Sequence, residues 1–117
     1  MLPLTEEILT IIVVSTSIPL GYLLGLYTES EIEDLAEWMN INKIFGSYIV
    51  VLEAIVLTLL AFIDNPSYGI AAGIMILLNL ILAAMHSAAV SNLGKTVRYQ
   101  AVFLVVGFAA LAVAVYL

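Results

Sequence analysis

A single acidic residue, Glu53, interrupts a long apolar segment and is its only charged residue between positions 44 and 63. In a helix that crosses a membrane, an ionised carboxylate near the middle costs on the order of 3 kcal/mol, so we expect this side chain to face protein and not lipid. The chemistry that suits such a group is the binding of a proton or a cation. The alternative is a protonated, purely structural glutamic acid that is hydrogen-bonded to a neighbour.

Two further polar residues, Asn79 and His86, lie in the next apolar segment. They are seven residues apart, so in a helix they share nearly the same face. Asn79 should lie at a depth similar to Glu53, because a short turn separates the two segments. We expect Glu53, Asn79 and His86 to form an ion- or proton-binding site. Interhelical hydrogen bonding by Asn79 and a satisfied helix-end position for His86 are the structural alternatives.

The first apolar segment contributes hydroxyl groups and a proline to the predicted site. Thr16 and Ser17 lie close to its centre, and Pro19 follows them. Pro19 removes a backbone donor and should kink or locally open a helix, which frees carbonyl groups for polar neighbours. We therefore expect Pro19 to act as a hinge, and a hydroxyl group of residues 15–17 to meet Glu53 and Asn79.

Small residues recur at four-residue spacing in several segments. The longest series is Ser17, Gly21 and Gly25, and Gly69 with Gly73 repeats the spacing. Such residues let helix backbones approach closely in a membrane, where no hydrophobic force drives association. They predict packing inside one bundle or, alternatively, a homo-oligomer interface.

Several functions are excluded or disfavoured by missing residue types. The chain has no cysteine and one histidine, which argues against thiol chemistry, a metal site or a familiar catalytic triad. It lacks a phosphate-binding loop, and its net charge of −6 gives no reason to expect nucleic-acid binding. We assign no catalytic residue, metal or cofactor, and rank an enzyme below the non-catalytic functions.

The elements that position these residues are four apolar runs. Hydrophobic residues make up 64% of the 117 and charged residues only 10%, a composition that no soluble domain of this size presents to water. Each run approaches the roughly 20 residues that cross a bilayer, and none shows the alternation of barrel strands. We predict an all-α membrane protein, a four-transmembrane-helix bundle forming one integral membrane domain over residues 1–117. The helices are expected near 8–27, 44–63, 68–91 and 98–117.

Between the first two helices, Ser30 and Glu33 form a capping box before an amphipathic pattern. This predicts a short helix over about 31–40 that lies at the membrane interface, anchored by Trp38. Its acidic face could instead serve for docking or cation collection. Glu6 and Glu7 stand where a secretory signal would have basic residues, so the first segment is expected to remain as a span.

The basic residues give an orientation in the cell membrane. Lys43, Lys95 and Arg98 flank the first and third loops, and basic loops are retained in the cytoplasm. Loops 1–2 and 3–4 are therefore predicted to be cytoplasmic and both termini outside.

Two classes of function fit these expectations. The first is a small ion- or proton-coupled transport protein that uses Glu53. The second is a non-catalytic subunit or scaffold of a larger membrane complex. Besides the lipid bilayer, the expected partners are further copies of the chain or other chains of such a complex.

Overall fold

The computed structural model describes residues 4–28, 38, 46–90 and 93–116. These residues form four α-helices, and none of them lies in a strand. The helices are α1 (Leu4–Tyr27), α4 (Ser47–Phe62), α5 (Tyr68–Val90) and α6 (Leu93–Tyr116). The predicted interfacial helix over 31–40 falls outside the described residues, apart from an exposed Trp38.

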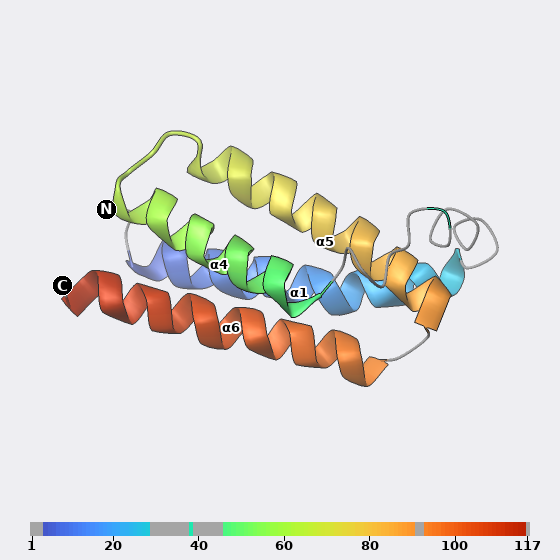
Figure 1. Cartoon of the computed structure of the whole chain (residues 1–117). Helices are drawn as coiled ribbons and strands as arrows, with labels where there is room; N and C mark the ends of the chain where they lie inside the picture. The colour runs from blue at the N-terminus through green and yellow to red at the C-terminus, as the bar shows by residue number, and fades with distance from the viewer. Residues whose placement is uncertain (1–3, 29–37, 39–45, 91–92, 117) are drawn as a thin grey trace.

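The helices form an elongated bundle in which successive elements run in opposite directions (Figure 1). α1 packs most extensively against α5, and then against α6. α4 packs mainly on α6, and its contact with α5 is much smaller. The beginning of α1 and the end of α6 therefore lie at the same end of the bundle (Figure 1).

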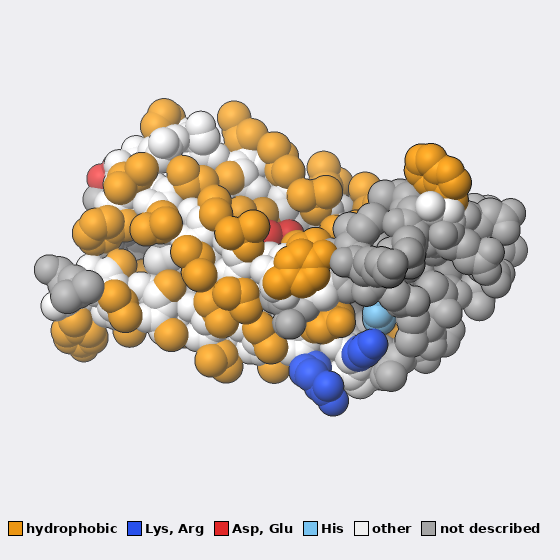
Figure 2. All heavy atoms as spheres, viewed as in Figure 1, with side chains coloured by type: hydrophobic (Ala, Val, Ile, Leu, Met, Phe, Trp, Pro, Cys, Tyr) orange, Lys and Arg blue, Asp and Glu red, His pale blue; other side chains and the backbone are white. Residues whose placement is uncertain are grey.

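Three helices, α1, α5 and α6, are long and apolar enough to cross a membrane. α4 is apolar but shorter, with 16 residues, which corresponds to about 24 Å at the helical rise. Many large hydrophobic side chains on all four helices are exposed, and Figure 2 shows one mostly hydrophobic face of the bundle. An apolar outer surface is expected where lipid or another protein replaces water.

Two helices begin earlier than the hydrophobic pattern predicted. α1 starts at Leu4 instead of about 8, and α6 starts at Leu93 instead of about 98. The prediction began the first helix just after Glu7 and the last helix at Arg98, but further charged residues can belong to the first turn. Glu6 and Glu7 complement the positive end of the helix dipole, and the side chain of Lys95 can extend toward water from a helix end.

The predicted turn between the second and third apolar segments is present, and α4 ends there in a Schellman motif. The backbone N–H of Asn65 donates to the carbonyl of Leu60, and that of Asp64 donates to Ala61. Asp64 adopts the left-handed conformation, with φ of 52°, at the position where glycine is usual. The Asn65 side chain then accepts a hydrogen bond of 2.9 Å from the backbone N–H of Ser67, which closes the turn before α5.

The series of small residues in α1 lies against α5. A Cβ atom added at Gly21 would stand 2.6 Å from the carbonyl oxygen of Leu80. One added at Gly25 would meet the backbone of Ala84 and the Cβ of Ser87. Only glycine allows the two helices to approach this closely, so these two residues fix the distance between α1 and α5.

Gly69 and Gly73 have different surroundings from Gly21 and Gly25. A Cβ atom at either position would meet no described atom within 4 Å, and both residues are exposed. They make no close helix contact within the described part of the chain. Of the two roles predicted for this pair, a homo-oligomer interface is the one that stays a hypothesis.

Candidate functional site

Glu53 lies near the middle of α4 and is only 8% exposed. Its side chain borders a pocket of about 310 Å³ between α4 and α5. The other lining residues are all apolar: Leu52, Val56, Ala71, Ile74, Met75 and Leu78. The carboxyl group is therefore held at the contact between two helices, in surroundings that supply almost no polar atoms.

Asn79 of α5 is the polar side chain that interacts with the Glu53 carboxyl group. It is completely buried. The two carboxyl oxygens of Glu53 have no hydrogen bond of standard geometry among the described residues. The same is true of the amide oxygen and nitrogen of Asn79. Buried polar atoms are usually satisfied, and an unsatisfied one is costly. The pair can bind a small polar species or a cation without first giving up a strong internal hydrogen bond.

The hydroxyl groups of α1 bond within their own helix. Ser15 and Thr16 each donate to the carbonyl of Ile12, at 2.8 and 2.7 Å, and Ser17 donates to that of Val14. Pro19 lies inside α1, which continues as one helix from Leu4 to Tyr27. No hydrogen bond joins residues 15–17 to Glu53 among the described residues, since back-bonding to a helix carbonyl is the readily available alternative.

His86 lies farther along α5 and is buried. Its ring meets the ring of Tyr99 from α6 edge to face, with 6.0 Å between the ring centroids, and the positive charge of Lys95 acts on it. Ser87 and Thr96 are buried in the same part of the molecule. The structure thus places His86 in a polar contact between α5 and α6, two helical turns from Asn79.

A second buried acid, Glu7, was not singled out from the sequence. It is 1% exposed, and one of its oxygens accepts a hydrogen bond of 2.7 Å from the Tyr68 hydroxyl. A signal for its burial was present, because Glu7 is in helical register with the buried Ile11, Val14 and Ile18. Nothing in the sequence pattern identified Tyr68, which comes from a helix that begins far along the chain.

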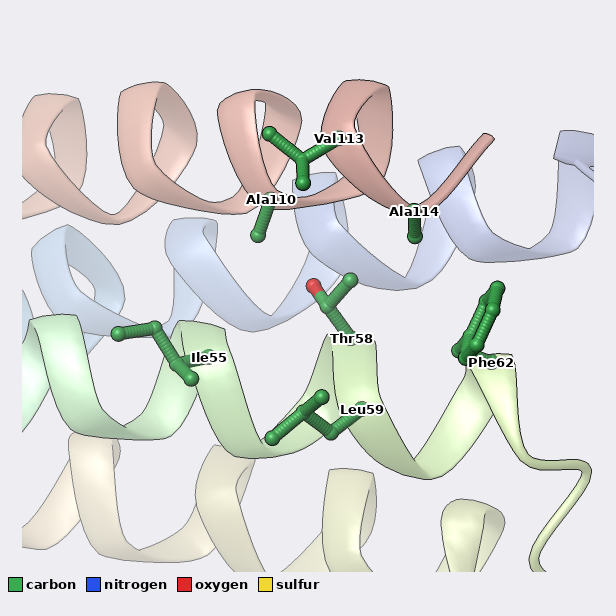
Figure 3. A pocket seen from close by; sticks show the side chains of 7 residues that line it. All are labelled: Ile55, Thr58, Leu59, Phe62, Ala110, Val113 and Ala114. Atoms are coloured by element: carbon green, nitrogen blue, oxygen red, sulfur yellow. The ribbon is translucent and has the colours of Figure 1, made fainter. Parts of the chain in front are cut away.

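An apolar pocket of about 360 Å³ lies between α4 and α6 (Figure 3). Ala110 and Ala114 point from α6 toward α4, where Thr58 and Phe62 stand on the opposite wall (Figure 3). Thr58 is the only polar side chain of its lining. This pocket lacks a charged group and offers no chemistry of its own.

Searches of protein-family models, of curated proteins and of solved structures find no match to this chain.

Proposed function

We propose that this chain is a four-span membrane protein that binds a proton or a small cation at Glu53 and passes it across the bilayer. The observation that carries the proposal is the Glu53 carboxyl group itself. It lies near the middle of an apolar helix, it is buried, and its oxygens are unpartnered among the described residues. Acidic residues inside membrane spans are rare and face the bundle interior, where they mark ion pathways and proton relays.

α4 can serve as the fourth span although it is short. Its length of about 24 Å compares with a hydrocarbon core of about 30 Å. A bilayer thins locally around a short helix at a modest cost in free energy. The polar turn around Asp64 and Asn65 would then lie at one membrane surface.

Asn79 and His86 complete the proposed pathway along α5. Asn79 faces Glu53 and would orient the bound species through its amide. His86, buried two turns away, would exchange protons with the end of the bundle that carries Lys95. Pro19 would let α1 flex beside this route, with Thr16 and Ser17 as supporting hydroxyl groups.

The test is a flux assay with the purified chain in liposomes under proton, sodium and potassium gradients. Wild-type protein is expected to dissipate at least one gradient. Glu53→Gln should abolish that flux while leaving the protein folded, because the amide keeps the shape and loses the exchangeable charge. Glu6→Gln, which removes an exposed carboxylate, is the matched control and should leave the flux unchanged. Equal flux from wild type and Glu53→Gln would refute the proposal.

A second candidate function is a non-catalytic subunit of a membrane complex. The observation in its favour is the pocket beside Glu53, whose remaining lining is entirely apolar and so gives no continuous polar path. The open faces of Gly69 and Gly73 would then be contact surfaces for another chain. Folded wild-type protein without flux under any gradient, recovered from native membranes only together with a partner chain, would favour this function.

A further inference from the structure

The bundle holds another acidic residue, Glu7, at the end where α1 begins and α6 finishes (Figure 1). Its oxygen Oε2 accepts the hydrogen bond from the Tyr68 hydroxyl group. Its oxygen Oε1 is buried and has no hydrogen-bond partner among the described residues. One oxygen of this carboxyl group is therefore held in position by Tyr68, and the other is available to bind a proton.

The groups around Glu7 come from three helices and include no cation among the described residues. α5 contributes Tyr68 through its hydrogen bond, and α4 places the Thr58 hydroxyl group nearby. The exposed Glu6 is the titratable neighbour on α1 itself. In α6, residues 107–115 contain no titratable side chain.

The basic residues that the structure describes, Lys95 and Arg98, lie in the first turns of α6, at the opposite end of the bundle. Figure 2 shows Lys and Arg side chains gathered at that end. A buried carboxylate without a positive neighbour is expensive. In the buried state Glu7 is therefore most stable as the neutral, protonated acid. Its ionised form is stable only when water or another polar group is close to the carboxylate.

The geometry favours a proton over a metal ion. Hard metal cations are usually held by about six or more oxygen atoms. The site offers the Glu7 carboxyl group with the hydroxyl groups of Tyr68 and Thr58, and Thr58 already donates to the carbonyl of Ala54 at 3.0 Å. A proton needs only Oε1. When it leaves, the Oε1–H bond breaks, water accepts the proton, and Tyr68 continues to hydrogen-bond the carboxylate.

We propose that Glu7, held in place by Tyr68, is a second proton-binding site of this protein, located at the end of the bundle where α1 begins and α6 ends. This inference rests on the proposed transport function for its role, because a site at one end would exchange protons between water and Glu53. Binding and release at Glu7 can nevertheless be measured without any transport.

The experiment is a pH titration of the full chain in lipid nanodiscs, followed by infrared difference spectroscopy of the carbonyl stretch of protonated carboxyl groups. Glu7→Gln is expected to remove one titrating carboxyl signal, and Glu53→Gln a different one. Tyr68→Phe should shift the frequency and the titration midpoint of the Glu7 signal only, which reports on the site even if Glu7→Gln folds poorly. Glu6→Gln is the matched control, because Glu6 is exposed and should contribute no signal from a buried acid.

The proposal is overturned if Glu7→Gln and Tyr68→Phe both leave the buried-carboxyl signals of wild type unchanged. It is supported by loss of the signal in Glu7→Gln together with its shift in Tyr68→Phe. A parallel flux assay separates the two ideas. Absence of flux in wild type with a titrating Glu7 signal would refute transport and leave the proton site standing, whereas flux that depends on Glu53 without a Glu7 signal would refute the second site alone.

Discussion

Gly21 of α1 lies so close to Ala83 of α5 that a Cβ atom on the glycine would stand 2.8 Å from the methyl carbon of the alanine. The same added atom would stand 2.6 Å from the carbonyl oxygen of Leu80, which is backbone and cannot move aside alone. α1 and α5 form the largest helix contact of the bundle. Their separation therefore depends on the absence of a side chain at this position.

The first prediction compares two glycine substitutions. Gly21→Ala should destabilise the protein by about 1–3 kcal/mol, because the methyl group forces the helices apart. Gly73→Ala is the control, since it faces open space and should stabilise the helix by about 0.5–1 kcal/mol. Thermal unfolding in detergent measures both. Equal shifts of the unfolding temperature in the two variants would show that Gly21 is not needed for close packing of α1 on α5.

The second prediction concerns the orientation in the membrane. The chain has no cysteine, so a single introduced cysteine reports its own position. Ser67 and Lys95 are both exposed and lie at opposite ends of the bundle. A cysteine at Ser67 should react with a membrane-impermeant thiol reagent in intact cells, and one at Lys95 only after permeabilisation. The reverse labelling pattern would mean that the basic loops lie outside.

The third prediction tests the contact between Tyr68 and Glu7. Tyr68→Phe should lower the stability by about 1–3 kcal/mol, because it leaves a buried carboxyl group without its donor. Combining it with Glu7→Leu should cost less than the sum of the two single changes. Tyr116→Phe, at a residue that is 89% exposed, should have no effect. Strict additivity of the two single changes would show that the hydrogen bond contributes nothing.

The fourth prediction tests whether Glu53 and Asn79 act as a pair. In a double-mutant cycle with Glu53→Leu and Asn79→Leu, residues in contact give a coupling energy of about 0.5–3 kcal/mol. We expect the second substitution to lower the free energy of unfolding much less once the first polar group has been removed, because a single buried polar group without a partner is the destabilising arrangement. Unfolding of the four proteins in detergent measures the coupling. A value near zero would mean that the two side chains do not interact.

The sequence predicted the helical class and the approximate helix positions, because long uncharged apolar runs without alternation form helices and not barrel strands. That Glu53 and Asn79 lie at a similar depth in a bilayer stays a prediction, although the structure does bring Asn79 to the Glu53 carboxyl group. The importance of Glu7 was missed since charged residues were taken to end a helix, although its spacing from Ile11 and Val14 matches the buried face. No pattern within one helix could reveal that Tyr68 would reach it, because that contact depends on how α1 and α5 are arranged.

The packing of α1 on α5 and α6 has a consequence for the order in which the protein folds. Of the four described helices, α1 is synthesised before the others, yet its main partners, α5 and α6, follow only after α4. Until α5 emerges, the closely packed face around Gly21 has no partner, and Glu7 lacks its hydrogen-bond donor. α1 can therefore complete its packing only after α5 and α6 have been synthesised.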